Sequence, residues 1–500
     1  MPGRDGRSSA VYVVMVTPEC APVAQAGGVG DVVFGLSREL ELRGNAVEII
    51  LPRYDCLRTD QIWGLTLDYR DLWVPWYGGA VHCSVWFGLV HGRKCFFIEA
   101  HSRERFFNRP SIYGFADDAL RFCFFSKAAL EYMLKAGKRP QVIHCHDWPT
   151  GLVPVLLFEI YKFHGMADQR SCYTIHNFRH QGLVGAEVLR ASGLNRPEYY
   201  LAPDRMRDNL HSGALNLMKG GIVYANFVTT VSRHHAWEVM NTEQGFGLGP
   251  TLYAHRRKFG GVRNGVDYAV WNPEVDALIP YRYGANDLAG KYRDKEALRE
   301  RLGLRRGFKP LVAYVGRLDE QKGPRLIRDA LRYSLANGAQ FVLLGPASDR
   351  EAERDFGPLA QEFRHHPDCR VVLAFDRELA HLVYAGADLI VVPSNYEPCG
   401  LVQMIAMRYG TVPVVRAVGG LVETVFDRDY SDEPPERRNG YVFGQPDASG
   451  LQSAMRRALG LWNSYPGEFR SLLLNAMRCD YSFAQPARDY LNIYEYIRHK

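Results

Sequence analysis

The stretch VYVVMVTPECAPVAQAGGVGDVVFGLSRELELRGNAVEIILP, residues 11–52, decides the fold. It opens with a short apolar run, VYVVMVTPE, whose β-branched residues predict a buried strand. A glycine-rich turn follows, and apolar residues at helical spacing then predict a helix that begins at Asp31 and stops at Gly44. The second apolar run, residues 46–52, predicts another buried strand. Strand, turn, helix and strand in this order make a βαβ unit, which requires a parallel sheet.

The same rhythm recurs along the chain. Apolar runs that end in polar residues are QVIHCHDW and SCYTIHN in the first half, and KPLVAYVGR, AQFVLLG, CRVVLAFD and DLIVVPSNYE in the second. Between the two groups, RNGVDYAVWNPEVDALIPYRYGAND (residues 263–287) is rich in turn residues and has no helical period. The sequence therefore predicts an α/β protein of two parallel-sheet domains with a cleft between them and a boundary near residue 265. The polar residues 1–10 are expected to be disordered.

Composition excludes several classes of protein. The 500 residues suit two large domains, and 47% hydrophobic with 23% charged residues is typical of a globular protein. The net charge of +6 is spread without a basic block, so no nucleic-acid partner is expected. No apolar run is long enough to span a membrane. VYVVMV followed by Ala24-Gln25-Ala26 resembles a signal peptide, but cleavage there would remove the first strand. Ten cysteines without a CxxC pair favour free thiols and a cytoplasmic location.

Polar residues stand at the ends of five predicted strands. They are Glu19, Asp147, His176, Arg317 and Glu397. Ligands of open parallel sheets bind beyond the carboxyl ends of the strands, so together these residues indicate a site.

The glycine turn of residues 24–33 offers bare N–H groups ahead of a helix, where an anion can approach Gly28 and Gly30. A dinucleotide fingerprint is not satisfied, because Val33 stands where the third glycine is required. The second strand also ends without the acidic residue that would hold a ribose. The remaining alternative is a tight turn that only packs the helix on the strand.

The stretch VGRLDEQKG, residues 315–323, places two cations in a strand-to-helix loop. Arg317 ends a strand, and Lys322 precedes a helix expected to open at Pro324. Two cations beside helix N–H groups can hold a diphosphate without a metal, although a solvated turn is the plainer interpretation. A Walker loop is absent, which excludes a P-loop ATPase.

The stretch NYEPCGLVQMIAMRYG, residues 395–410, predicts a helix from Pro398 to Gly410 with Glu397 as its N-cap. Glutamate is a poor N-cap, so we expect its carboxylate to serve a ligand while the helix dipole keeps it ionised. The N–H groups expected beside it belong to Cys399, Gly400 and Leu401.

No metal site is predicted. His144 and His146 lie on one face of a strand, but no second ligand pair at metal spacing follows them. Asp427-Arg428-Asp429 resembles the metal-binding Asp-x-Asp of some sugar transferases, and is expected to form a surface loop.

Taken together, the motifs resemble those of bacterial glycogen synthases and plant starch synthases, which are retaining α-glucosyltransferases of the GT-B type with two Rossmann-like domains. The resemblance runs from about residue 11 to about residue 494 and is nearest to the soluble III/IV starch synthases. It rests on ECAPVAQAGGVGDVV, LPRYDCL, YGFADDALRF, IHCHDWPTGLVP, YTIHNFRHQG, RNGVDYAVWNP, GRLDEQKG and EPCGLVQMIAMRYGTVPVVRAVGGLVETV. It implies an N-terminal domain over 11–265, a nucleotide-sugar-binding domain over 266–480, and a final helix over 481–500 that crosses back to the first domain.

The resemblance also implies the chemistry. Glucose would pass from ADP-glucose to the 4-hydroxyl at the non-reducing end of an α-1,4-glucan, with no metal cofactor. Arg317 and Lys322 would stabilise the departing diphosphate, and Glu397 would support the oxocarbenium-like transition state. The other implied contacts are His176 on the donor sugar; Gln25, Gly28, Gly30, Asp31, Asn264, Cys399, Gly400 and Leu401 around the donor; and Asp147 and Tyr113 in the sugar and acceptor region.

Three positions depart from the family pattern. Gln25 replaces a lysine that touches the donor phosphates, Val418 replaces a threonine, and Phe483 replaces a tryptophan, which is expected to be a packing change. Losing a charge-assisted phosphate contact costs about 1.5–3 kcal/mol, or roughly ten- to a hundredfold in affinity. Two alternatives therefore remain: a related transferase that uses UDP-glucose or a small acceptor, and a catalytically weak glucan-binding or initiation protein.

Overall fold

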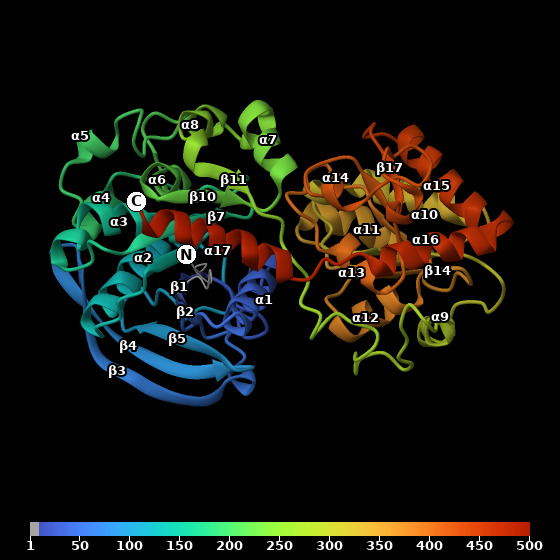
Figure 1. Cartoon of the computed structure of the whole chain (residues 1–500), viewed down its shortest axis with the longest axis horizontal. Helices are drawn as coiled ribbons and strands as arrows, with labels where there is room; N and C mark the ends of the chain where they lie inside the picture. The colour runs from blue at the N-terminus through green and yellow to red at the C-terminus, as the bar shows by residue number, and fades with distance from the viewer. Residues whose placement is uncertain (1–9) are drawn as a thin grey trace, which may run out of the picture. The chain divides into compact units, whose positions relative to one another are not determined.

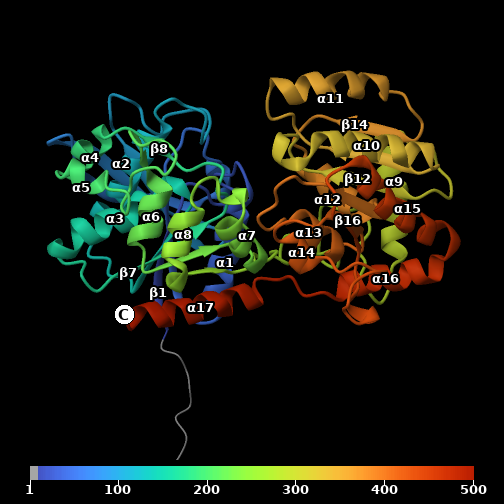
Figure 2. The same cartoon turned by 90° about the horizontal axis from the view of Figure 1, so that it is seen from above.

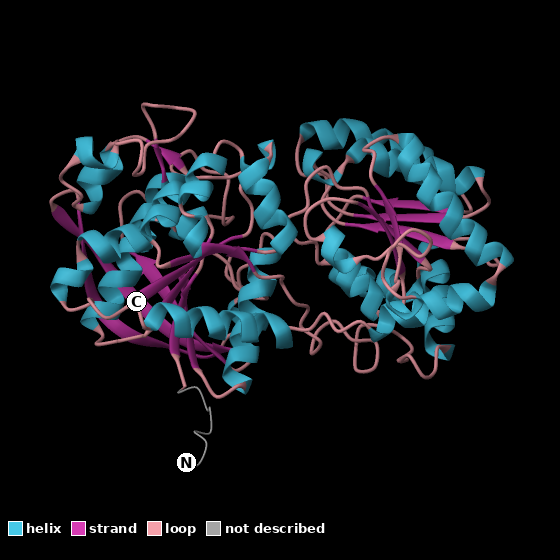
Figure 3. Cartoon of the chain, turned by 45° about the horizontal axis from the view of Figure 1, so that its top comes forward, coloured by secondary structure: helices cyan, strands magenta, loops and turns pink. Residues whose placement is uncertain are grey.

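The computed structural model describes residues 10–500, so the disorder expected for the first nine residues concerns a segment outside the described residues. The chain divides into two compact units (Figure 1). The first runs to Gly265 and also contains Phe483–Lys500, and the second is Val266–Ser482. In each unit, helices pack against a mainly or wholly parallel sheet (Figure 3). The predicted α/β architecture of two parallel-sheet domains is confirmed.

The sheet of the first unit has nine strands in the order β11-β10-β7-β6-β1-β2-β5-β4-β3. The strands from β11 to β5 are parallel, whereas β4 and β3 continue the sheet antiparallel. The predicted βαβ unit is confirmed, because β1 and β2 pair in parallel with Val13 opposite Val47. The strands are β1 (Tyr12–Val16), β2 (Ala46–Pro52), β3 (Trp63–Trp76), β4 (Gly79–Val90), β5 (Arg93–Ala100), β6 (Val142–His146), β7 (Arg170–Ile175), β10 (Phe227–Thr230) and β11 (Phe259–Gly261), with β8 (Leu183–Val184) and β9 (Leu215–Asn216) forming a separate pair.

The first helix begins earlier than the sequence predicts. It starts at Gly28 and not at Asp31, so Gly28 and Gly30 belong to its first turn. Two backbone N–H groups just before it, those of Ala26 and Gly27, donate to the Glu19 carboxylate and turn the chain into the helix there. The helices of this unit are α1 (Gly28–Leu42), α2 (Asp118–Lys135), α3 (Leu152–Glu159), α4 (Glu187–Ser192), α5 (Pro197–Tyr200), α6 (Leu217–Tyr224), α7 (Arg233–Asn241), α8 (Gly249–Ala254) and α17 (Ala484–Arg498).

The C-terminal helix α17 packs within the first unit, against α1 and β7, although it follows the whole second unit in sequence (Figures 1 and 2). Phe483, just before it, is buried, and its ring lies so close to Gly35 of α1 that any Cβ at Gly35 would overlap it. Farther along, the Tyr494 hydroxyl forms a hydrogen bond with Nδ1 of His144 on β6 at 2.7 Å. The helix is therefore tied to the sheet by both packing and hydrogen bonds.

The sheet of the second unit is wholly parallel, in the order β14-β13-β12-β15-β16-β17. Counted along the chain this is 3-2-1-4-5-6, the doubly wound order, whose connections reverse direction between β12 and β15. The strands are β12 (Leu311–Val315), β13 (Gln340–Leu344), β14 (Cys369–Val372), β15 (Leu389–Val392), β16 (Val412–Arg416) and β17 (Tyr441–Phe443). The helices are α9 (Ala289–Leu302), α10 (Pro324–Ala336), α11 (Arg350–Glu362), α12 (Arg377–Gly386), α13 (Val402–Arg408), α14 (Leu421–Thr424), α15 (Ala448–Ser464) and α16 (Pro466–Arg478).

One helix of this unit differs from its predicted start. Helix α10 begins at Pro324 as predicted, but α13 begins at Val402 with Leu401 as its N-cap, four residues after the predicted start at Pro398. Gly400 has a φ of +74°, a left-handed conformation that no α-helix continues through. Glu397 is therefore in a turn and is not a helix cap. No helix within residues 10–500 is both long and apolar enough to cross a membrane.

Candidate functional site

In the first unit most of the candidate residues follow the carboxyl ends of three adjacent strands, β1, β6 and β7, whereas Tyr113 and Asn264 follow β5 and β11. Glu19, after β1, is 2% exposed and organises the loop. One of its oxygens accepts the N–H groups of Ala26 and Gly27 at 2.7 and 2.8 Å, and the other accepts the hydroxyl of Tyr113 at 2.9 Å. A buried carboxylate thus joins the glycine loop to Tyr113, although the two are far apart in sequence.

Gln25 lies on the exposed side of this loop. Its side-chain amide donates to the carboxylate of Asp31 at 2.7 Å, in the first turn of α1. Asp31 is favoured there because a helix N-terminus attracts negative charge. The loop is closely packed beside this pair, since a Cβ at Gly30 would lie 3.1 Å from the Ala21 nitrogen. The structure therefore brings Gln25, Asp31 and the two predicted glycines together.

Asp147 and His176 are also brought together. One carboxylate oxygen of Asp147 accepts the backbone N–H of His176 at 2.6 Å and that of Asn177 at 3.3 Å. Asp147 itself has a φ of +59°, an unusual conformation for a residue with a side chain. Burial raises the pKa of Asp147 to about 7, and the two N–H groups partly oppose that rise. Asp147 thus fixes the backbone that carries the His176 ring.

The His176 ring is neutral at physiological pH. Only 8% of the residue is exposed, and burial lowers its pKa to about 3. Its Nε2 atom faces Nδ1 of His146 at 3.1 Å. Asn264, near the end of the same unit, is 6% exposed, and its side-chain oxygen has no hydrogen-bond partner among the described residues. That oxygen is a buried acceptor, of the kind that normally has a hydrogen-bond partner.

In the second unit the candidate residues follow β12 and β15, the two strands that flank the reversal in strand order. Lys322, in the loop after β12, donates from Nζ to Oε2 of Glu397 at 2.5 Å. Ser394 donates its hydroxyl to the same oxygen at 2.8 Å. Glu397 is 5% exposed, so this is a largely buried carboxylate with two donors on one oxygen. Lys322, not the helix dipole, balances its charge.

Arg317 is placed differently from Lys322. Its side chain is 52% exposed, and its guanidinium lies 3.7 Å from the carboxylate of Asp319. Asp319 also caps the short turn Glu320–Lys322 by accepting the N–H of Lys322. The loop therefore presents one solvent-exposed cation and one cation that is bound to Glu397.

The turn around Glu397 depends on glycines. A Cβ at Gly419 would overlap the carbonyl oxygen of Glu397, and one at Gly420 would overlap that of Cys399. The N–H of Gly420 donates to the Glu397 carbonyl at 3.1 Å. Because α13 begins at Val402 with Leu401 as its N-cap, the N–H groups of Cys399 and Gly400 belong to this turn, and the prediction that they open the helix is wrong. They still lie next to the Glu397 backbone.

Some residues that build the site were not predicted as site residues from the sequence. Glu19 was noticed only as a polar strand end, yet it holds the glycine loop and Tyr113. Ser394 was not identified, although it lies three residues before Glu397 in the same strand-end segment. Asp319 has a detectable signal, since an Asp three residues before Lys322 is a common cap. Among the described residues, no group of three or more His, Cys, Asp or Glu side chains is arranged to hold a metal.

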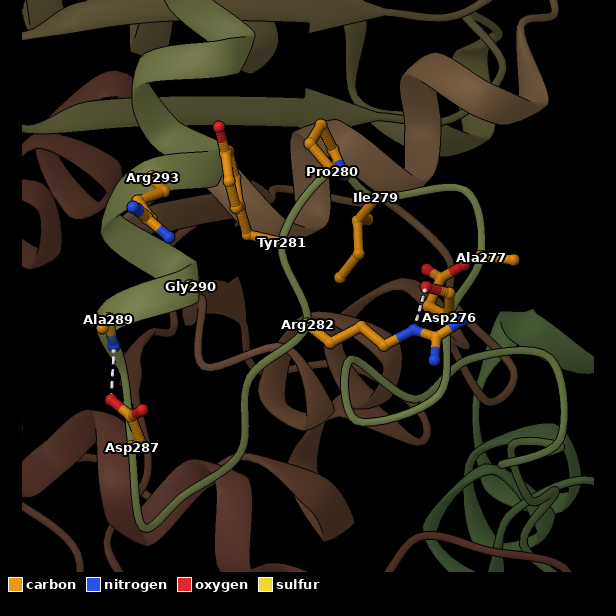
Figure 4. Close-up of a pocket in the computed structure, with 10 residues that line it drawn as sticks. All are labelled: Asp276, Ala277, Ile279, Pro280, Tyr281, Arg282, Asp287, Ala289, Gly290 and Arg293. Atoms are coloured by element: carbon orange, nitrogen blue, oxygen red, sulfur yellow. Dashed lines mark hydrogen bonds between the residues drawn. The ribbon is translucent and has the colours of Figure 1, made fainter.

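The second unit also contains an open pocket of about 510 Å³, which shares no residue with these groups (Figure 4). Its polar side chains include Arg282, Arg293 and Asp287. The Arg282 side chain extends away from Arg293 and donates to the Asp276 carbonyl. Converging groups are what hold a small ligand, and these do not converge.

Comparisons with known proteins agree over nearly the whole chain. Residues 12–254 match the family model of the starch synthase catalytic domain, and residues 294–466 match that of glycosyl transferases group 1. Glycogen synthase 2 of Methylococcus capsulatus is 61% identical over 97% of this chain and 100% of its own length. Glycogen synthase 1 of a Synechococcus species is 60% identical over 98% of this chain and 100% of its own length. Among solved structures, the catalytic domain of starch synthase IV from Arabidopsis thaliana, bound to ADP and acarbose, is similar with a TM-score of 0.96 and 41% identity, covering 98% of this chain and 100% of that one.

Proposed function

Because this chain belongs to the family of bacterial glycogen synthases and plant starch synthases, we propose that it transfers glucose from ADP-glucose to the non-reducing end of an α-1,4-glucan with retention of configuration. Membership makes it a glucosyltransferase with the GT-B fold. The choice of donor is supported by the ADP in the similar starch synthase IV. The glucan acceptor is supported by the glycogen synthases that share about 60% of its residues.

The observation that carries the proposal is the buried contact between Lys322 and Glu397 at 2.5 Å. In the proposed reaction the diphosphate departs with negative charge, and positive charge develops on the glucose. Lys322 and the exposed Arg317 supply cations for the departing diphosphate, and the Glu397 carboxylate supplies the anion for the positive charge on the glucose. Two side-chain cations at this loop make a metal unnecessary for the proposed step, and none is proposed.

In the first unit, we assign His176 to the donor sugar, with Asp147 holding its backbone. The amides that open α1 at Gly28 and Gly30 are assigned to the donor phosphates, which suits the positive end of a helix dipole. We assign Tyr113 and the unpartnered side-chain oxygen of Asn264 to hydrogen bonds with sugar hydroxyls. All ten cysteines are free, which supports a reducing compartment, and we place the reaction in the cytoplasm.

The test is the initial rate of labelled glucose transfer to glycogen, with ADP-glucose and UDP-glucose side by side, in the wild type and in Gln25→Lys. Gln25→Met, of similar length but without charge, is the matched control. We expect ADP-glucose to be strongly preferred. The lysine should lower the KM for this donor by roughly tenfold, because it adds a charge-assisted phosphate contact, whereas methionine should not. A preference for UDP-glucose would identify the alternative donor. Glycogen binding without turnover of either donor would overturn the synthase assignment in favour of a glucan-binding protein.

A further inference from the structure

Three buried histidines lie in a row, two of them on β6 and the third just after β7. Their rings follow one another closely, with centroids 4.2 Å apart from His144 to His146 and 5.4 Å apart from His146 to His176. His144 is bound at both nitrogens, by the Thr174 hydroxyl at 2.7 Å and the Tyr494 hydroxyl at 2.7 Å. His146 is bound at one only: its Nδ1 faces His176, and its buried Nε2 has no partner among the described residues.

The contact between His146 and His176 restricts where their protons lie. Burial lowers the pKa of His176 to about 3 and that of His146 well below its usual value, so both rings are neutral near pH 7. A neutral imidazole has one N–H and one bare nitrogen. A hydrogen bond between Nδ1 of His146 and Nε2 of His176 therefore requires one proton and one lone pair across the 3.1 Å gap.

Two arrangements satisfy this requirement, and they differ in what they leave buried. If His176 donates, the remaining proton of His146 lies on its Nε2 as a buried N–H without an acceptor. If His146 donates, its Nε2 is a bare acceptor. Buried N–H groups without a partner are rarer than unpaired acceptors, because the lost hydrogen bond to water is not replaced. The second arrangement is favoured, and it puts the proton of His176 on Nδ1.

We propose that His146 is a positioning residue that fixes His176 in the tautomer with its proton on Nδ1, so that His176 presents a hydrogen-bond donor to the sugar nucleotide. The identity of the ligand in this inference rests on the proposed function, whereas the tautomer of His176 does not. The Nε2 atom of His176 is bound to His146, whereas Nδ1 has no hydrogen-bond partner among the described residues and the residue is 8% exposed, so Nδ1 is the nitrogen left for a ligand.

The tautomer matters for the class of ligand. Phosphate oxygens only accept hydrogen bonds, whereas sugar hydroxyls both donate and accept. A ring that presents N–H can bind either group, but one that presents a bare nitrogen repels a phosphate oxygen. His146 thereby makes the His176 position compatible with all parts of a sugar diphosphate, without any change in charge.

The direct test is a ¹⁵N spectrum of the full-length protein labelled at histidine, with the His176 signals identified by their loss in His176→Gln. We expect a pyrrole-type Nδ1 and a pyridine-type Nε2 for His176. His146→Asn keeps an N–H near the position of Nδ1 and should retain this pattern. His146→Phe keeps an aromatic ring between its neighbours but removes the donor, and should release His176 to the other tautomer.

The kinetic test uses the same variants with ADP-glucose and glycogen. His146→Phe should lower kcat/KM by about ten- to a hundredfold, as removal of an orienting partner generally does, and His146→Asn should restore most of it. Tyr494→Phe alters the same cluster at His144 and should leave kcat/KM unchanged. A pyridine-type Nδ1 in the wild type would overturn the proposal, and so would full activity of His146→Phe. If the wild type transfers no glucose, the proposed function fails, and the spectrum still decides the tautomer.

Discussion

Replacing Lys322 with methionine should loosen the second unit around Glu397. The ammonium lies 2.5 Å from the carboxylate, and the two side chains are 19% and 7% exposed. At an effective dielectric constant of about 20, the attraction is roughly 6–7 kcal/mol before the cost of desolvating both charges. Removing one partner of a buried pair typically costs about 3–5 kcal/mol, because the other charge is left uncompensated. Ser394 still donates to Glu397, so we expect about 3 kcal/mol for Lys322→Met.

Glu397→Gln should cost less than Lys322→Met. A neutral amide oxygen can still accept from Lys322 and Ser394, and the lysine is exposed enough to recover part of its hydration. The double variant leaves no buried charge, so it should be more stable than Lys322→Met alone. The expected coupling between the two sites is about 2 kcal/mol, within the range of contacting residues.

Hydrogen exchange of the full chain suits this measurement, because unfolding of two units is not a single two-state transition. Amides of β15 and α13 should exchange about a hundredfold faster in Lys322→Met, whereas amides of β1 and β6 in the first unit should be unaffected. Unchanged exchange at β15 and α13 would refute the reasoning. It would mean that the ion pair is solvated despite its small exposure and contributes as little as a surface pair.

Three further changes test the first unit. Asp147 binds its proton more tightly in the folded than in the unfolded chain, because its pKa is about 7 when folded against the ordinary value of 3.8. Its contribution to the free energy of unfolding therefore falls by at most about 4 kcal/mol as the pH rises from 3.8 to about 7. Between about pH 4 and pH 7, Asp147→Asn should therefore lose less melting temperature than the wild type. The buried histidines titrate in both proteins and so do not affect this comparison. Gly35→Ala should destabilise the packing of α1 against α17 by about 1–3 kcal/mol, because the added methyl group overlaps the Phe483 ring. Adding Phe483→Leu to this variant should reduce the overlap, and urea unfolding measures both effects. Tyr494→Phe should cost about 1–3 kcal/mol by leaving Nδ1 of His144 unpaired, seen as faster exchange in α17, with the more exposed Tyr496→Phe as control.

Much of the parallel framework could be predicted because buried strands are short apolar runs. The runs at β1, β2, β6, β7, β12, β13 and β15 were all recognised within a few residues of their observed bounds. Strands β3, β4 and β5 were not. Much of β3, WGLTLDYRDLWVPW, is exposed, so it lacks the continuous apolar character of its neighbours. The start of α13 was wrong because proline favours turns as well as first helical positions, and only the backbone of Gly400 separates the two.

The positions of the candidate residues could be predicted from strand ends, but their partners could not. Lys322 and Glu397 are 75 residues apart, and they meet because β12 and β15 are neighbours in the sheet. Apolar periodicity identifies both strands and says nothing of their order. Likewise, the link from Glu19 to Tyr113 spans 94 residues and required the packing of the whole first unit. The sequence thus indicates which groups are available, and the topology decides which of them act together.

The loops that follow β1 and β12 differ in charge. The loop after β1 and the first turn of α1 carry the carboxylates of Glu19 and Asp31, and Gln25 adds no cation. With lysine at position 25, the contact to Asp31 would become an ion pair, and the exposed part of the loop would be neutral. With glutamine it keeps one negative charge, so the amides at the start of α1 must compensate for it. In the proposed reaction the cationic stabilisation therefore comes mainly from Arg317 and Lys322. Because Lys322 is already bound to Glu397, Arg317, with its exposed side chain, is the cation that a diphosphate can engage at least cost.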